Sequence, residues 1–426
     1  MTINLRDTAE RALAALRRQG FDHAQVGVAL TTHSEVTAAH NQPSLLRSTE
    51  TFKLSLLGLV DGRKASTEVG DAGDDSLAES VAALWASAAA APQDEANAVS
   101  AGQQARIVQG PTTAELATLA DTMGELLAWR AANTPTMMLE EGLAGHTLRR
   151  SQTLTSGGSD VACEVGWYEL VVMGSASEGG ASSSFNYAGG TSHELAGLPA
   201  ADRFGLGTMM RALTRQVHTQ PLAERFVGDV VLTPAAATEL LGWLIDQVSD
   251  GALITDTSVY RHRAGEQIAS PLLDLRSRFS APGVVPLSGD AFNTPPVHLL
   301  RAGTLTCLTP SLYGSRRTGL PHVPTANGWD LAAGSTPLAE MLAAVPRGAL
   351  VDRLSMGDPA PNGDFSGVIK NSFLIEGGEV GPALSEVMIS GNVAQMLRDI
   401  VAVSAERIDT GGSVLPWLRI GGLHFT

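Results

Sequence analysis

The chain is poor in the residues that form covalent or metal cross-links. Cys163 and Cys307 are its only cysteines, and no Cys-x-x-Cys pair occurs. A thiolate zinc site and a dithiol redox site both need closely spaced cysteines, so the sequence excludes them. Apolar residues lie close to both cysteines, which predicts two reduced thiols in the core.

Positive charge is also scarce. Lys53, Lys64 and Lys370 are the only lysines, and the formal net charge is -15. Binding to nucleic acid needs clustered Lys and Arg, so we expect no nucleic-acid partner. The Ala-rich run 81–91 is far shorter than the ~20 residues of a membrane span, so we expect no membrane contact. No basic segment followed by an apolar one opens the sequence, which predicts a cytoplasmic protein.

The common catalytic motifs are missing as well. His193-Glu194 begins a zinc motif, but the next histidine is His218, too far along the chain for one helical site. No Gly-x-Ser-x-Gly nucleophile elbow occurs. The pairs Gly157-Gly158 and Gly179-Gly180 lack the residues of a phosphate loop, so we interpret them as turns.

The pattern that is present predicts helices and strands in succession. Capping boxes indicate helices that begin at Asp7, Ser76 and Thr112, each with Glu three residues later. Asp61-Gly62 predicts a hairpin after a strand over 51–60. Pro234 suits the first turn of a helix that runs to about residue 248. A chain of 426 residues is too long for one ordinary core, so we expect two domains.

Arg316, Arg317 and His322 are candidate binding residues. They lie in the Gly- and Pro-rich region 270–346, where we expect short strands and long loops. Long ordered loops often line sites, and paired arginines bind carboxylates or phosphates. The three residues are therefore candidates for contact with a substrate cavity or a partner. The alternative is an ordinary solvated loop.

The most distinctive block lies near the C-terminus. Residues 363–367 read Gly-Asp-Phe-Ser-Gly, and 375–379 read Ile-Glu-Gly-Gly-Glu. The spacing predicts strands over 365–369 and 372–376, a hairpin turn at Gly377-Gly378, and a third strand over 386–389. Asn392 is then expected to cap a helix.

This block resembles the TldD/PmbA family, whose PmbA branch is also called TldE. The chain ending Ser-Val-Leu-Pro-Trp-Leu-Arg-Ile-Gly-Gly-Leu at 413–423 matches too. The resemblance implies an α+β fold in two domains. Residues 1–220 would form a domain of helices and an antiparallel sheet, and residues 221–426 a β-rich, barrel-like domain with flanking helices.

The resemblance also implies where a zinc site would lie. TldD-like subunits look like zinc metallopeptidases with His-Glu-x-x-x-His on a helix and a cysteine near the C-terminus. In this sequence Gly242, Trp243 and Gln247 stand at the motif positions, and 409–413 contains no cysteine. A catalytic zinc needs three protein ligands. We therefore expect no catalytic residue, metal ligand or cofactor in this chain, and zinc in a partner subunit.

These expectations predict a non-catalytic, TldE-like subunit of a heterodimeric zinc metallopeptidase. It would shape a cavity for a peptide or peptide-like substrate, such as a natural-product precursor, beside a TldD-like partner. Two alternatives stay open: a self-sufficient non-zinc hydrolase in a natural-product pathway, and a homodimeric binding protein.

Overall fold

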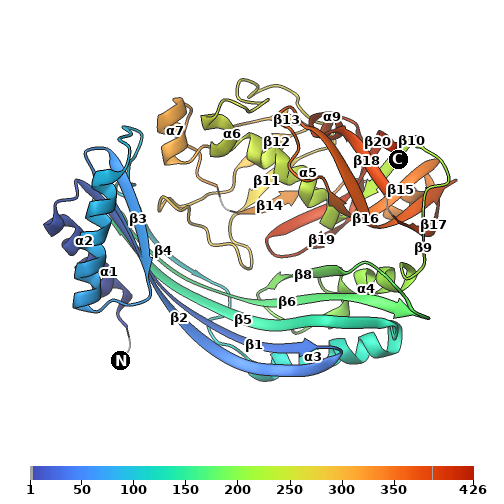
Figure 1. Cartoon of the computed structure of the whole chain (residues 1–426), viewed down its shortest axis with the longest axis horizontal. Coiled ribbons are helices and arrows are strands. Elements are labelled where there is room, and N and C mark those ends of the chain that lie inside the picture. Colours follow the sequence, from blue (N-terminus) through green and yellow to red (C-terminus); the bar gives the residue numbers. More distant parts are fainter. Residues whose placement is uncertain (1–2, 326, 386) are drawn as a thin grey trace.

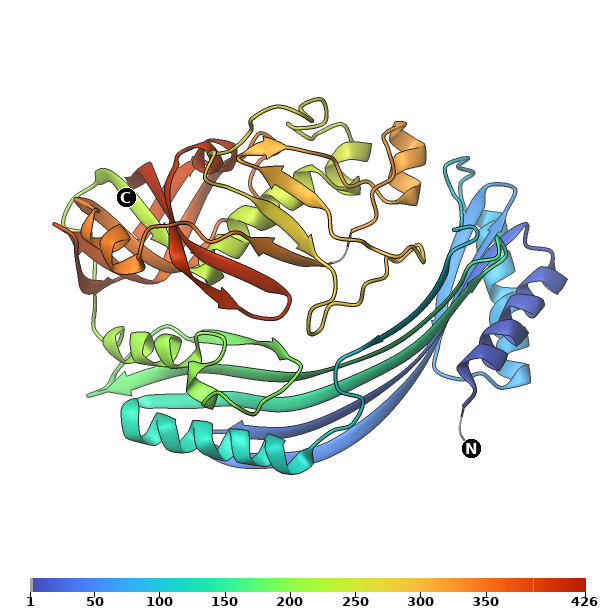
Figure 2. The ribbon, with the colours of Figure 1, turned by 180° about the vertical axis from the view of Figure 1, so that it is seen from behind.

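Two units, each built on its own sheet, make up the molecule (Figure 1). The computed structural model describes residues 3–325, 327–385 and 387–426. A long, curved sheet from the first half of the chain faces the second unit with its concave side (Figure 2). The fold is α+β with a curled antiparallel sheet followed by a barrel-like sheet with helices, which confirms the predicted class.

The N-terminal sheet has the order β3-β2-β1-β5-β6-β4, with β7 and β8 also paired to β6. All its pairs are antiparallel except β4 with β6. The predicted hairpin at Asp61 and Gly62 is confirmed, because both residues have positive φ and Val60 pairs with Arg63. The strands are β1 (His23–Ala39), β2 (Gln42–Val60), β3 (Arg63–Val69), β4 (Gln104–Gln109), β5 (Met137–Thr155), β6 (Asp160–Glu178), β7 (Ala181–Ser182) and β8 (Asn186–Ser192).

Helices cover the convex side of this sheet at both ends (Figures 1 and 2). One apolar cluster joins α1 (Leu5–Gln19) and α2 (Asp74–Ala90) to β1 and β2. A second joins α3 (Leu116–Asn133), η1 (Ala200–Asp202) and α4 (Leu206–Arg215) to β5 and β6. The period-two alternation of the strands leaves the concave side free for other contacts.

The second sheet curls around a larger core. Its order is β13-β12-β11-β14-β20-β10-β15-β16-β17-β9, with β18 and β19 paired to β20. Most of helix α5 is buried against it. Its strands are β9 (Thr219–Gln220), β10 (Phe226–Leu232), β11 (Leu275–Arg278), β12 (His298–Arg301), β13 (Thr304–Leu305), β14 (Gly328–Leu331), β15 (Arg347–Ser355), β16 (Asp364–Glu376), β17 (Glu379–Leu384), β18 (Val387–Asn392), β19 (Ile400–Asp409) and β20 (Ser413–Phe425). Its helices are α5 (Pro234–Gln247), α6 (Asp250–Ile254), α7 (Leu312–Thr318), α8 (Leu338–Ala343) and α9 (Val393–Arg398).

The predicted starts of the first three helices are wrong by two to four residues. The N-cap of α1 is Asn4, whose side chain accepts hydrogen bonds from the backbone N–H groups of Arg6 and Asp7. Helix α2 begins after Gly73 without a side-chain cap, and α3 begins after Glu115. The predicted boxes lie inside the first turns of α1 and α2 and before the start of α3, so the spacing alone does not locate the cap.

The C-terminal block folds as predicted, except that two expected strands are one continuous strand. The expected strands over 365–369 and 372–376 form the single strand β16, in which Asn371 has a φ of 51° and interrupts the register with β15. The turn at Gly377 and Gly378 leads into β17, and Asn392 caps α9 by accepting from the backbone N–H of Gln395. Residue 386, in the predicted third strand, lies outside the described residues.

Hydrogen bonds join the two units at both ends of the curved sheet. At one end the N–H of Thr191 donates to the carbonyl of Thr410 over 3.0 Å. At the other, the Tyr313 hydroxyl donates to Asp94 over 2.7 Å. The chain passes between the sheets after α4, near the predicted boundary at 220 and 221, which stays a prediction. No helix in the described part of the chain is long and apolar enough to cross a membrane.

Asp160, at the start of β6, ties three elements together and predicts a pH effect. Its carboxylate accepts from Gln152 over 2.9 Å and pairs with Arg106 and Arg6 at 2.8 and 2.9 Å. Burial raises the pKa of Asp160, but the hydrogen bonds from Gln152, Arg106 and Arg6 outweigh it, and the pKa lies below its ordinary value.

A lowered folded-state pKa means that the contribution to stability is complete above the unfolded pKa of about 3.9 and is lost as the pH falls below it. We expect Asp160→Asn to cost about 1 kcal/mol at pH 7, after allowance for solvent screening. Urea unfolding of both proteins between pH 7 and pH 3 measures the difference. A difference that does not shrink in acid would contradict the assigned role of the carboxylate.

Candidate functional site

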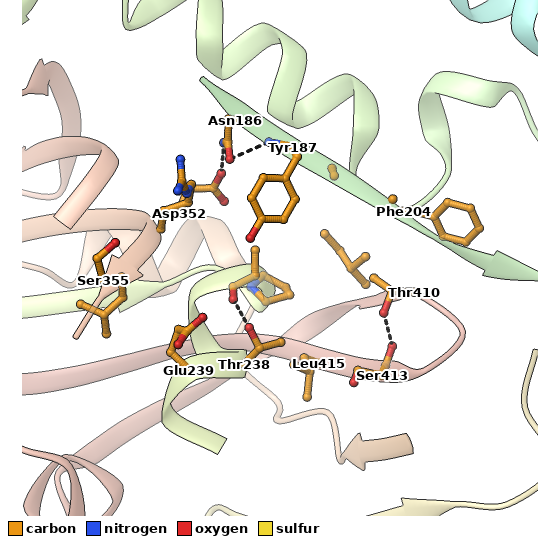
Figure 3. Close-up of a pocket in the computed structure, with 17 residues that line it drawn as sticks. Asn186, Tyr187, Phe204, Thr238, Glu239, Asp352, Ser355, Thr410, Ser413 and Leu415 are labelled. Carbon is orange, nitrogen blue, oxygen red and sulfur yellow. Dashed lines mark hydrogen bonds between the residues drawn. The ribbon is translucent and has the colours of Figure 1, made fainter. Parts of the chain in front are cut away.

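A cavity of about 290 Å³ lies between the two units. Its walls come from β8 and the loop before α4 on one side, and from α5, β15 and the β19–β20 hairpin on the other (Figure 3). The lining residues are Asn186, Tyr187, Ala188, Gly189, Phe204, Pro234, Ala235, Thr238, Glu239, Asp352, Arg353, Leu354, Ser355, Ile408, Thr410, Ser413 and Leu415.

The start of helix α5 supplies one wall. Pro234 occupies the first turn as predicted, and the Thr233 hydroxyl caps the helix by accepting from the N–H of Ala236. Ala235, Thr238 and Glu239 follow at helical spacing, so they share the face that lines the cavity. Thr238 and Glu239 project from this face in Figure 3.

The opposite wall is held by contacts that cross between the units. Tyr187 extends from β8 toward α5 (Figure 3). Asp352 accepts from Asn186 over 2.6 Å and from the Thr233 hydroxyl over 2.8 Å, which links β8, β15 and the start of α5. The Arg353 guanidinium lies 4.5 Å from the Phe185 ring centroid and 5.6 Å from that of Tyr187. These contacts fix the distance between the two walls.

The hairpin between β19 and β20 closes one end of the cavity. Its tip, 409–413, is the segment that the family resemblance associates with a ligand cysteine, and Thr410 and Ser413 line the cavity. Arg278 pairs with Asp409 over 2.7 Å, and Asp409 accepts from the N–H of Gly411 over 2.8 Å. The structure thus brings this tip and the cavity face of α5 into one site.

The residues at the three zinc-motif positions have different surroundings. Gly242 continues the cavity face of α5, and a side chain there would meet nothing within 4 Å. Trp243 is buried, 6% exposed, and packs edge-on against Tyr260 with ring centroids 5.9 Å apart. The Gln247 side-chain oxygen accepts from the N–H of Val259 over 2.9 Å.

These residues do not fit a zinc ion. Glycine has no donor atom for zinc, the Trp243 indole is buried in the core, and the Gln247 oxygen already has a partner. Burial raises the pKa of the neighbouring Tyr260 hydroxyl to about 12, as expected for a phenol that is shielded from solvent. Across residues 3–325, 327–385 and 387–426, no group of three His, Cys, Asp or Glu side chains has an arrangement that could hold a metal.

Arg316, Arg317 and His322 lie away from the cavity. The two arginines belong to the short helix α7 rather than to a loop, and Arg316 donates to the carbonyl of Glu95 over 2.8 Å. Arg317 lies 3.8 Å from the carboxylate of Asp94. These contacts connect α7 to the N-terminal unit, at the end of the curved sheet that is remote from β8 (Figure 1). Contact of the three residues with a substrate or partner stays a prediction.

The His193-Glu194 pair and the two cysteines lie in surroundings that suit structural roles. His193 and Glu194 lie in the loop after β8 and not on a helix. Cys163 is buried and Cys307 partly buried, and burial raises the pKa of both thiols. A raised pKa lowers the fraction of reactive thiolate, which favours a packing role.

Sequence reasoning missed residues on both sides of the cavity. Tyr187 and Asn186 come from a short Gly-rich strand, and Asp352 and Arg353 from a strand more than 160 residues later. None of them belongs to a local motif. The one signal in the sequence is the glycine run in 186–192, which allows close approach of two backbones. A side chain on Gly190 would lie 2.8 Å from the backbone of Thr410.

Comparison with known proteins relates the C-terminal unit to a family. Residues 227–426 match the PmbA/TldA metallopeptidase C-terminal domain. The chain is 26% identical over 227 residues to the metalloprotease PmbA of Escherichia coli O157:H7, covering 50% of this chain and 49% of that protein. It is 23% identical over 228 residues to the PmbA homologue of Haemophilus influenzae, again covering 50% and 49%. The chain thus spans about half the length of the curated relatives it matches.

The second unit of this chain therefore matches the PmbA/TldD family of metallopeptidase-related proteins, which confirms the predicted family resemblance. Its fold is similar to that of TldE from Thermococcus kodakarensis, with a TM-score of 0.83 and 18% identity. That similarity covers 98% of this chain and 100% of the archaeal chain, so it extends over both units.

Proposed function

We propose that this chain is the non-catalytic, TldE-like subunit of a heterodimeric zinc metallopeptidase. In this proposal a TldD-like partner carries the zinc, and this chain shapes the cavity that receives a peptide or peptide-like substrate. The likeness of the whole fold to TldE and the family match of residues 227–426 support it.

The observation that carries the proposal is the chemistry of α5. The three motif positions hold a glycine, a buried tryptophan and a glutamine whose oxygen is hydrogen-bonded to the backbone. A hydrolytic zinc needs three protein ligands and an open position for water. A cavity is nevertheless present beside α5, and Asp352 links its walls. A cavity without metal ligands suits binding rather than hydrolysis.

Co-expression with a family member that carries His-Glu-x-x-x-His tests this function. We expect a 1:1 complex that hydrolyses an unstructured fluorogenic peptide and loses activity with chelator, whereas this chain alone has no activity. The matched control replaces the Glu of the partner's motif by Gln, which should abolish hydrolysis and preserve assembly.

Three results would contradict the proposal. Stoichiometric zinc and activity in the lone chain would make it a metallopeptidase itself. Activity that survives chelator in a homogeneous preparation of the lone chain would favour a self-sufficient hydrolase. A stable homodimer that does not exchange with the partner would favour a binding protein.

A further inference from the structure

The volume and lining of the cavity between the units suit a single side chain of a ligand rather than a folded protein. About 290 Å³ is near the lower end of the range for ligand pockets, roughly 300–1,000 Å³. Phe204, Ile408 and Leu415 supply apolar surface in its lining. Such a pocket gains free energy when an apolar side chain leaves water and enters it.

Three charged side chains line the cavity, and they differ in whether they already have partners within the protein. The Asp352 carboxylate is engaged by Asn186 and Thr233. The Arg353 guanidinium donates to the carbonyl of Phe185 over 2.9 Å and lies over aromatic rings. Two carboxylates and one guanidinium leave a net charge of about -1, which favours a positively charged ligand.

Glu239 is the one of the three that is free to meet a ligand. It is exposed on the cavity face of α5. Within the described ranges 3–325, 327–385 and 387–426, its carboxylate has neither a hydrogen bond nor an ion pair. A carboxylate without an internal partner beside an apolar pocket attracts ammonium and guanidinium groups.

We propose that this cavity binds an apolar side chain of an extended peptide together with an adjacent positively charged group, and that Glu239 selects the charge. The proposal rests on the proposed function only for the class of ligand, a peptide. It assigns a specificity determinant to the subunit that lacks the metal ligands. The occupant is an unfolded segment, because a folded protein cannot present a side chain and its neighbour inside so small a space.

Binding of two short unstructured peptides tests the proposal. The peptides are identical except that one contains Phe-Lys and the other Phe-Glu. We expect the full chain to bind the Phe-Lys peptide more tightly in a fluorescence anisotropy titration. Glu239→Gln should reduce this preference by about 2- to 5-fold, the usual range for an exposed ion pair.

Two further variants separate charge from shape. Asp246→Asn removes an exposed carboxylate from the same helix without touching the cavity lining, so it should leave the preference unchanged. Ala235→Leu fills part of the cavity and should abolish binding of both peptides. Equal binding of the two peptides, an equal effect of Glu239→Gln and Asp246→Asn, or no effect of Ala235→Leu would overturn the proposal.

The outcome is distinguishable from a failure of the proposed function. If the chain assembles with a metallopeptidase partner and the complex has no preference for Phe-Lys, the selective pocket is refuted and the subunit role stands. If the lone chain prefers Phe-Lys but never assembles with such a partner, the pocket stands and the subunit role is refuted. If the peptides bind neither to the lone chain nor to the complex, the proposed pocket is refuted.

Discussion

Trp243→Ala is expected to lower the free energy of unfolding by about 3–5 kcal/mol, as large-to-small substitutions of buried aromatic residues do. The indole is 6% exposed and packs edge-on against Tyr260. It also reaches the start of β16, because a Cβ on Gly363 would lie 3.1 Å from the indole Cζ2. The substitution therefore removes a contact between α5 and the C-terminal block.

Urea unfolding followed by far-UV circular dichroism measures this loss without relying on tryptophan fluorescence. Trp243→Phe is the matched control, since it keeps an aromatic ring against Tyr260 and should lose less stability. The zinc content of the purified protein should be the same in all three proteins. A near-neutral Trp243→Ala, or a change in zinc content, would show that Trp243 does not have the core position described.

Gly411→Ala is expected to cost about 2–4 kcal/mol, because it strains the backbone and collides with the other unit. Gly411 has a φ of 82°, a conformation that residues with a Cβ rarely adopt. An added Cβ would lie 1.9 Å from the Thr191 hydroxyl oxygen and 2.6 Å from the Thr191 carbonyl oxygen. Relief of these contacts requires the β19–β20 hairpin to move away from β8.

The neighbouring glycine provides a matched control. A Cβ on Gly412 would meet nothing within 4 Å, and Gly412→Ala should change stability by less than about 1 kcal/mol. Hydrogen exchange at the N–H of Thr191, which donates to Thr410, reports the contact between the units directly. We expect faster exchange in Gly411→Ala and unchanged exchange in Gly412→Ala. Equal behaviour of the two variants would contradict the close approach of the hairpin to β8.

Local patterns predicted the elements that depend on neighbouring residues. Asp61-Gly62 and Gly377-Gly378 were placed correctly in turns because glycine tolerates positive φ. Pro234 marked the start of α5 because its missing N–H costs nothing in the first helical turn. The helix starts at Asn4 and Gly73 were missed, since the one capping box near each start lies inside the helix, three residues after the observed cap. Asn371 was also missed, because nothing in the sequence signals its positive φ.

The cavity could not be predicted in the same way. Tyr187, Glu239, Asp352 and Thr410 come from four separate segments, and no spacing along the chain relates them. Arg316 and Arg317 were favoured because two adjacent arginines suggest an anion site. The structure shows them at a different contact between the units, which their sequence context does not distinguish from a binding loop.

The sequence by itself determined which chemistry is absent from α5, because side-chain identity at Gly242, Trp243 and Gln247 decides whether donors for zinc exist. It also determined the family, through the motifs of the C-terminal block. Only the tertiary structure decided that a cavity forms beside α5, that Asp352 links its walls, and that Glu239 lines it without a partner among the described residues. The physical reason is that turns and caps are short-range, whereas a cavity depends on the packing of strands far apart in the chain.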